Sequence, residues 1–162
     1  MSKADERVNA YGEVDELNSC VGILRTHVVD ADIDKLLAGI QSQLFDLGAE
    51  LATVPGRDAS GQPRLDANDV QALEAAIDHH EVGLPPLKTF VLPGGTSAAA
   101  HAHLARTVCR RAERGLVSLR VSSPIRDEAL QYINRLSDLL FVLARALNHA
   151  ASVPDVPWLG RG

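Results

Sequence analysis

The sequence is poor in features that would assign it to several broad classes of protein. Its 162 residues hold two cysteines, no run of 18 apolar residues and no basic-then-apolar leader at the start. We therefore expect no membrane span, and a cytoplasmic protein with reduced, buried thiols at Cys20 and Cys109. The formal net charge of −5 argues against a general nucleic-acid binder.

Signatures of metal and phosphate sites are also missing. No histidine follows a glutamate at a spacing of three, so the Glu-x-x-His pairs of di-iron helical bundles are absent. His101 and His103 would point about 200° apart on a helix and could not hold one ion together. The sequence has no Walker-type phosphate loop. We therefore expect no resident metal.

Long apolar repeats at helical spacing dominate what is present. Three segments place apolar residues alternately three and four positions apart, which keeps one face of each helix against a neighbour in a left-handed bundle. The members of the repeats are Ala10, Val14, Leu17, Val21, Leu24 and Val28; Ile33, Leu37, Ile40, Leu44, Leu47 and Leu51; and Ile133, Leu136, Leu140, Leu143 and Leu147.

Two further helices are expected between these segments. One runs from about Asp66 to His80, capped by Asp66 or Asn68, and the other follows "PGGTS" and continues to about Val121, capped by Thr96 or Ser97. The polar stretch "TVPGRDASGQPR" at 53–64 is expected to be a mobile loop, and "KTFVL" at 88–92 a short extended stretch. The sequence predicts one all-α domain over residues 1–162, a five-helix bundle.

The segment "ARTVCRRAER" at 105–114 gathers positive charge in an acidic protein. Arg106, Arg110 and Arg114 recur every four residues and form one row on a helix, which we call the arginine ladder; Glu113 lies beside it. Cys109 falls on the opposite, apolar side, which argues against a thiol nucleophile. Arginine also outnumbers lysine, 13 to 3, as is typical of GC-rich genomes. The number of arginines therefore indicates little about function, whereas their positions on the helix do.

Like charges at this spacing repel each other, so the ladder needs partners. They are either acids on neighbouring helices, such as Asp15 and Glu16, or a polyanion such as triphosphate, which the planar guanidinium grips well. The last helix also has an outer face that mixes apolar and polar residues, and such faces usually meet another subunit. We therefore expect an oligomer with functional polar residues at its interfaces; that outer face holds Asn134, Asp138, Leu139, Phe141 and Arg145.

Three blocks of the sequence resemble the PduO-type ATP:cob(I)alamin adenosyltransferase family. They are "AYGEVDELNSCVG" at 10–22, "FVLPGGTSAAAHAHLARTVCRRAER" at 90–114 and "NRLSDLLFVLAR" at 134–145. The resemblance implies a trimer of helical bundles with an active site at each subunit interface. It also implies transfer of the 5′-deoxyadenosyl group of ATP to reduced cobalamin, with release of triphosphate and assistance from magnesium.

The same resemblance assigns roles to individual residues. Contacts with ATP are implied for Lys3, Arg110, Arg111, Glu113, Arg114 and Asn134, with Arg110 also catalytic. Asp15 and Arg106 match a pair that links adjacent subunits. Phe90 matches a catalytic aromatic residue below the corrin ring, where it binds cobalamin; the less favoured alternative from position alone is that it anchors the turn in the core.

One departure from the family pattern bears on function. The Gly-, Thr- and Asp-rich segment that precedes the lysine in the family, and wraps the phosphates, has no counterpart before "MSKADERV". Either the segment is missing from this sequence, which is the favoured explanation, or the protein has lost part of its phosphate clamp. In the second case, the alternative to an enzyme is a trimer that carries cobalamin or has a regulatory role, with little turnover. A cob(II)alamin reductase and an adenosylcobalamin-dependent enzyme are the further partners expected.

Overall fold

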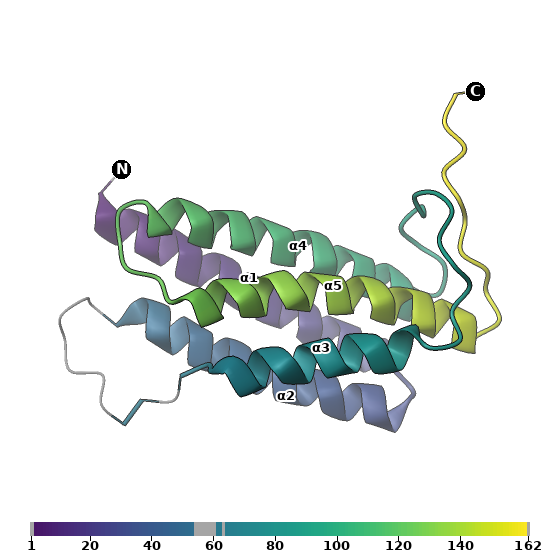
Figure 1. Ribbon diagram of the computed structural model, residues 1–162, viewed down its shortest axis with the longest axis horizontal. Helices are drawn as coiled ribbons and strands as arrows, with labels where there is room; N and C mark the ends of the chain where they lie inside the picture. Colours follow the sequence, from purple (N-terminus) through teal and green to yellow (C-terminus); the bar gives the residue numbers. More distant parts are fainter. Residues whose placement is uncertain (1, 54–60, 63, 162) are drawn as a thin grey trace.

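The computed structural model describes residues 2–53, 61–62 and 64–161, which form five α-helices (Figure 1). They are α1 (Lys3–His27), α2 (Ala31–Ala52), α3 (Ala67–Glu81), α4 (Ser97–Arg120) and α5 (Asp127–Ala150). Within these ranges the only β-type pairing is an isolated bridge between Val91 and Pro157. The expected all-α, five-helix fold is confirmed. No helix in the described part of the chain is long and apolar enough to cross a membrane.

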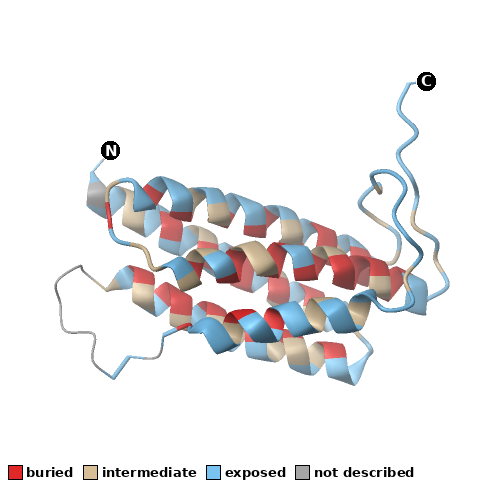
Figure 2. Ribbon diagram, in the orientation of Figure 1, coloured by how far each residue is buried: buried red, intermediate tan, exposed pale blue. Residues whose placement is uncertain are grey.

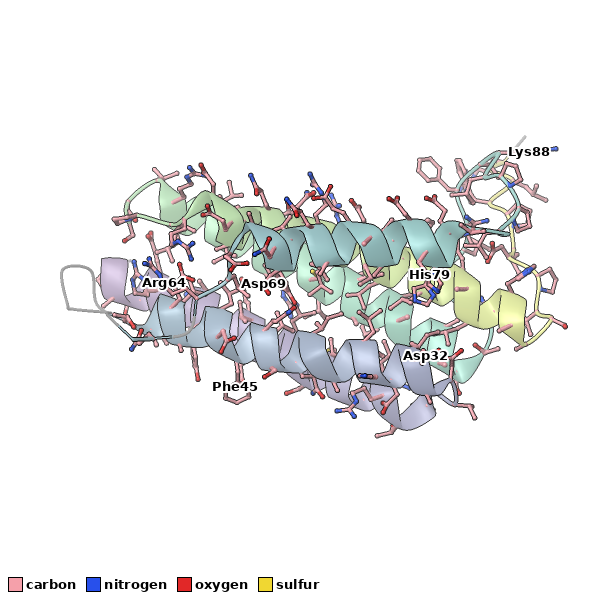
Figure 3. The ribbon with its side chains drawn as sticks, turned by 60° about the horizontal axis from the view of Figure 1, so that its bottom comes forward. Asp32, Phe45, Arg64, Asp69, His79 and Lys88 are labelled. Atoms are coloured by element: carbon pink, nitrogen blue, oxygen red, sulfur yellow. The ribbon has the colours of Figure 1, made fainter. Side chains whose placement is uncertain are left out.

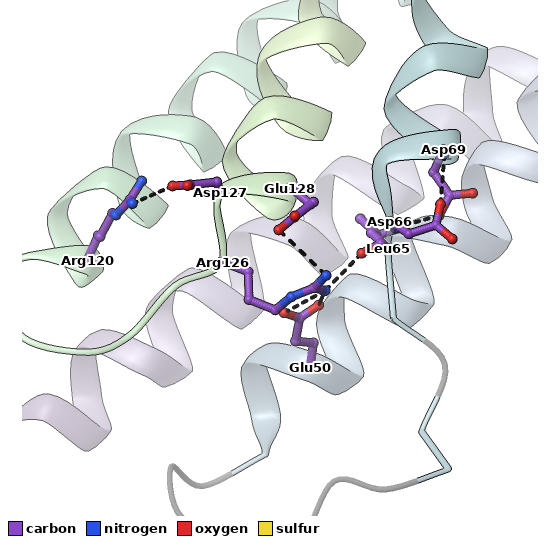
Figure 4. Close-up of polar contacts among 8 residues, drawn as sticks. All are labelled: Glu50, Leu65, Asp66, Asp69, Arg120, Arg126, Asp127 and Glu128. Atoms are coloured by element: carbon purple, nitrogen blue, oxygen red, sulfur yellow. Dashed lines mark hydrogen bonds and ion pairs between the residues drawn. The ribbon is translucent and has the colours of Figure 1, made fainter.

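Side-chain caps explain where the helices begin. Asp66 accepts a hydrogen bond from the backbone N–H of Asp69, and the Asp69 side chain accepts one from the backbone N–H of Asp66, a reciprocal capping box (Figure 4). Thr96 caps α4 through the backbone N–H of Ala99. Asp66 rather than Asn68, and Thr96 rather than Ser97, are therefore the caps, and a missing cap usually costs ~1 kcal/mol.

The helices pack side by side in the order α2, α1, α4, α5, α3, each against the next. The inward faces of α1, α2 and α5 are the heptad positions expected from the sequence (Figure 2). All members of the three repeats are buried except Val28, which lies just beyond α1 and is partly buried. A fully buried leucine is worth ~1.5–3 kcal/mol relative to an exposed one, so these repeats supply much of the core.

Some residues expected on the surface are buried by α3 and by the C-terminal tail. Leu139 was expected on an outer face of α5, but α3 packs on that face and leaves it fully buried. Arg145, expected on the same outer face, is only 5% exposed. Conversely, Cys20 is partly rather than fully buried, whereas Cys109 is enclosed and donates its S–H to the carbonyl of Ile133 at 3.3 Å.

The two ends of the bundle are closed differently. At one end Arg126 donates to the carbonyl of Leu65 at 2.8 Å and lies 3.4 Å from the Glu50 carboxylate, so it joins α2, the start of α3 and α5 (Figure 4). The mobile loop expected at 53–64 falls mostly outside the described residues. At the other end, residues 82–96 run beside the C-terminal tail (Figure 1).

Candidate functional site

The arginine ladder lies along α4 and has no acidic partner among the residues that the structure describes. Arg110 and Arg114 are exposed, Arg106 is partly buried, and none of the three makes an ion pair with any residue that the structure describes. The apolar side of the same helix is buried among α1 and α5, which holds the ladder on the outside. Repulsion along the row is therefore left uncompensated, as expected of a site for an anion.

A polar chain links α4 to α5 beside the ladder. Asn134 donates from Nδ2 to Glu113 Oε2 at 2.8 Å and accepts from Arg135 Nη1 at 2.8 Å. Arg135 in turn lies 3.9 Å from the Glu74 carboxylate of α3. The contact fixes the orientation of Glu113 and Asn134 relative to each other before any ligand binds. Two residues expected from the sequence to act together are thus brought together.

Arg111 differs from the ladder in having a partner. Its guanidinium forms an ion pair with Glu16 of α1. Glu16, one of the acids expected to serve the ladder, thus pairs with Arg111 instead, and among the described residues of one subunit no acid forms an ion pair with Arg106, Arg110 or Arg114. A role for Arg111 toward a ligand stays a prediction.

The N-terminal end of the ladder contains buried polar atoms without partners. Arg106 Nε and both ring nitrogens of His103 make no hydrogen bond in the described structure. Burial, followed by the nearby charge of Arg110, lowers the pKa of Arg106. Burial also lowers the pKa of His103, which sits edge-on to Phe141 with ring centroids 6.1 Å apart. Arg106 Nε needs an acceptor, and a neutral His103 needs one acceptor and one donor, which the described residues of this subunit do not provide.

A groove of about 400 Å³ runs between the ladder and α5. It is lined by Arg106 and Arg110 of α4, by Ser137, Asp138, Phe141 and Val142 of α5, and by Ile77 and Glu81 of α3. Asp138 and Glu81 line this groove without pairing with either arginine among the described residues. The groove therefore brings two arginines and two carboxylates next to an apolar wall.

Asp15 lies on α1 and is exposed, as expected from its position off the heptad repeat. It lines a hollow of about 230 Å³ together with Tyr11, Asn18 and Phe45. Phe45 is 69% exposed and points away from the bundle (Figure 3). Asp15 and Arg106 do not meet within the subunit, so their expected pairing across subunits stays a prediction.

Phe90 lies at the far end of the bundle, on the loop that leads into α4. Its side chain is 78% exposed, which excludes the alternative that it anchors the turn in the core. The ring packs edge-on to the Trp158 ring with centroids 6.2 Å apart. The backbone N–H of Trp158 donates to the backbone carbonyl of Phe90 at 2.8 Å. Phe90 and Trp158, here called the aromatic platform, together present an exposed apolar surface.

Backbone pairing holds the loop against the tail. The Leu92 N–H donates to the Val156 carbonyl at 2.8 Å, and Val91 and Pro157 form the isolated bridge, so the extended stretch expected at 88–92 is partly confirmed. The loop, the tail and α5 together line a hollow of about 520 Å³, and its lining includes Lys88, Asp155 and Arg145. Lys88 stands at the outer edge of this end of the molecule (Figure 3).

Two buried side chains of α5 hold the loop and the tail, and the sequence analysis missed their role. Arg145 donates from Nε to Asp155 Oδ2 at 2.9 Å and from Nη2 to the Pro85 carbonyl at 2.6 Å. Asn148 accepts from the Thr96 N–H at 2.9 Å and donates to the Gly94 carbonyl at 3.0 Å. The "GG" before α4 was the only local signal, because it marks a close approach of backbone to another group.

Two other sequence expectations concern ligands. Lys3 begins α1, but its side chain lies outside the described residues. His101 stacks on His27 at 4.4 Å while His103 faces Phe141, so the two histidines point to different neighbours. Among the residues that the structure describes, no group of three or more His, Cys, Asp or Glu is placed to hold a metal ion.

The sequence matches known proteins over nearly its whole length. The family model described as cobalamin adenosyltransferase matches residues 1–147. The cobalamin adenosyltransferase of Cupriavidus metallidurans is 47% identical over 98% of this chain and 83% of its own length. The corrinoid adenosyltransferase PduO of Citrobacter freundii is 44% identical over 93% of this chain, which spans only 45% of that longer relative.

A solved structure shares the fold. A variant of the PduO-type ATP:corrinoid adenosyltransferase from Lactobacillus reuteri, complexed with cobalamin and ATP, superposes with a TM-score of 0.90 at 39% identity. The match covers 99% of this chain and 87% of the other. The bundle and the loop and tail at its end therefore belong to one shared architecture.

Proposed function

The chain belongs to the cobalamin adenosyltransferase family, and from that membership we propose that it transfers the 5′-deoxyadenosyl group of ATP to reduced cobalamin. In this reaction the cobalt(I) centre forms a bond to C5′ of ATP. The C5′–O bond breaks, and its electron pair leaves with triphosphate. The observation that carries the proposal is the arginine ladder, because a row of cations without acidic partners is suited to a polyphosphate.

The ladder's contribution is to stabilise the leaving group. Negative charge grows on triphosphate as the C5′–O bond breaks, and preorganised cations lower the energy of that state without having to reorganise. Arg110 and Arg114 are exposed and form no ion pair within the described part of the chain, so ATP need not break one there to reach them. Glu113 and Asn134, already joined at 2.8 Å, are the matching polar groups for the nucleotide.

Magnesium fits this site as an ion that arrives with ATP. It commonly binds substrate phosphates and water together with only one or two protein carboxylates. The described residues offer no three-ligand cluster, but Glu113 stands beside the ladder as a single carboxylate. Magnesium bound there would neutralise part of the phosphate charge.

Phe90 is proposed to act on the other substrate. Cobalt(II) in solution keeps an axial base or water, whose lone pair raises the orbital that must accept the next electron. An exposed apolar ring under the corrin would exclude that ligand and make the metal easier to reduce, since axial ligation and dry surroundings both tune metal potentials. Its 78% exposure leaves the ring available for such a contact.

A trimer with the site between subunits would supply what one subunit lacks. Arg106 has a buried Nε without a partner, and Asp15 is exposed beside the exposed rings of Tyr11 and Phe45. Exposed apolar patches of this kind mark interaction surfaces. We expect Asp15 of one subunit to meet Arg106 of the next.

The pairing of Asp15 with Arg106 is testable by charge exchange. Asp15→Ala should weaken assembly or ATP affinity, and Asp15→Arg combined with Arg106→Asp should restore part of the loss. Sedimentation velocity and ATP titration measure the two effects. An Asp15→Ala protein that assembles and binds ATP like wild type would refute the pairing.

The activity itself is tested with ATP, magnesium, cobalamin and a strong reductant, while the corrin absorbance is followed. Formation of adenosylcobalamin at a steady rate supports the proposal. Stoichiometric binding without turnover would instead indicate the carrier alternative, and neither binding nor turnover would reject both.

A further inference from the structure

The platform stands on segments that lack regular structure of their own. Phe90 and Trp158 lie on the loop before α4 and on the C-terminal tail, which are joined by the hydrogen bonds from Trp158 to Phe90 and from Leu92 to Val156. A two-stranded contact this short is marginal in water without support from elsewhere. Something in the bundle must therefore hold the two segments in place.

Arg145 is placed to provide that support. Its guanidinium joins Asp155 on the tail to the Pro85 carbonyl at the base of the loop, at 2.9 and 2.6 Å. Its side chain is 5% exposed and that of Asp155 23%, so the ion pair is largely shielded from solvent. Because α5 is packed against α4 and α3, the guanidinium is fixed to the rigid part of the molecule.

We propose that Arg145 is a positioning residue, which ties the tail to the loop through Asp155 and so holds Trp158 against Phe90. The inference rests on the proposed function, in which the Phe90 ring faces the corrin. Arg145 itself contacts neither substrate. It fixes the backbone that carries the platform, so its loss should affect cobalamin chemistry and leave the ATP side intact.

The chemistry of arginine suits this role better than that of lysine. The planar fork donates in two directions at once, here to a carboxylate and to a carbonyl on different segments. A lysine at this position keeps the charge but cannot reproduce both directions. Arg145→Lys should therefore recover only part of what Arg145→Met loses.

The single tryptophan of the chain is Trp158, so its fluorescence reports docking of the tail directly and needs no ligand. Arg145→Met should shift the Trp158 emission to the red and increase its quenching by acrylamide. Loss of a charge-assisted hydrogen bond should raise the undocked population about tenfold or more. Asp155→Ala, which removes the acceptor on the tail, should give the same shift even if Arg145→Met folds poorly.

The second readout separates positioning from general stability. With cob(II)alamin as the starting substrate, both variants should raise KM for cobalamin and diminish the spectral signature of four-coordinate cobalt(II), while the Kd for ATP stays unchanged. Arg120→Met is the matched control, since it removes an exposed ion pair with Asp127 away from the platform, and it should behave like wild type.

Unchanged Trp158 emission in both variants would overturn the proposal. The proposal would also be overturned if both variants lost ATP affinity as much as cobalamin affinity, because that would show a purely structural role for Arg145. Absence of turnover in the wild-type protein would contradict the proposed function. The emission measurement requires neither substrate, so in that case it would still decide whether Arg145 docks the tail.

Discussion

The arginine ladder and the aromatic platform are built in opposite ways, although α4 connects them. The ladder stands in the middle of a long helix, where each residue is placed by its neighbours in the chain. The platform stands on a loop and a tail, and its two residues, Phe90 and Trp158, are 68 positions apart in the sequence. Its geometry depends on buried side chains of α5.

The difference teaches where each region is vulnerable. Arg110 or Arg114 can be replaced without disturbing the helix, because both side chains are exposed. The platform can be disturbed from a distance, through Arg145 or Asn148, without touching either ring. Substitutions in the two regions should therefore separate the handling of ATP from the handling of cobalamin.

The largest effect is expected at the centre of the ladder. Arg110→Ala should lower both ATP affinity and rate, because a charge-assisted contact to a polyphosphate is worth ~1.5–3 kcal/mol. Steady-state kinetics with varied ATP measure the loss. Arg120→Ala, beyond the ladder and paired with Asp127, should do little. Equal losses at both positions would mean that general positive charge, and not the ladder, matters.

A selective effect is expected at the platform. Phe90→Ala should lose about 10- to 100-fold in rate when cobalamin is supplied as cobalt(II), as for other changes around a metal centre. The loss should be smaller when a strong chemical reductant supplies cobalt(I), and ATP binding should persist. A variant that melts early and loses ATP affinity would contradict the exposed position of the ring. Wild-type behaviour in both assays would remove Phe90 from the cobalamin site.

Replacing Asn148 tests how much the junction between the loop and the start of α4 contributes to stability. Asn148→Ala leaves the Thr96 N–H and the Gly94 carbonyl without their partner, at a cost of about 1–3 kcal/mol in the free energy of unfolding. Chemical denaturation measures this cost. Gln131→Ala, exposed on the same helix, is the matched control and should be nearly neutral. A comparable loss in the control would deny Asn148 a special role.

The smallest effect concerns pH at the buried end of the ladder. Burial and then Arg106 lower the pKa of His103 from its ordinary value of 6.5, with a partial offset from Asp155. The unfolded chain therefore takes up the proton first, and stability should fall as pH drops below about 6.5. His103→Leu should flatten the dependence of unfolding on pH between 7 and 5, whereas His149→Leu, at an exposed position, should not. A curve unchanged by His103→Leu would contradict this.

Local periodicity explains why the fold and the ladder could be predicted. The heptad repeats predicted the core residues of α1, α2 and α5, and the four-residue spacing of the arginines predicted that they form one row on α4. Each of these predictions needs only the geometry of one helix and the preference of apolar side chains for burial. The positions of Glu113 and Asn134 followed as well, although their hydrogen bond did not.

The remaining features depend on contacts between distant segments. Leu139 and Arg145 looked like members of an outer face because the pattern of α5 does not reveal that α3 and the tail cover it. The same holds for Trp158, whose packing on Phe90 no periodicity could indicate. The contacts of Arg145 with Pro85 and Asp155 span 60 and 10 residues, and only the first lies beyond local geometry.

The contact between Asn148 and the glycines before α4 also constrains how this sequence could evolve. Gly95 has φ +106°, a conformation that disfavours every other residue, and a side chain there would overlap the Asn148 amide. Replacing Asn148 first would relieve the overlap but not the backbone strain, so neither order of substitution opens an easy route. Gly95 and Asn148 should therefore persist together through long divergence, with the glycine the less replaceable of the two.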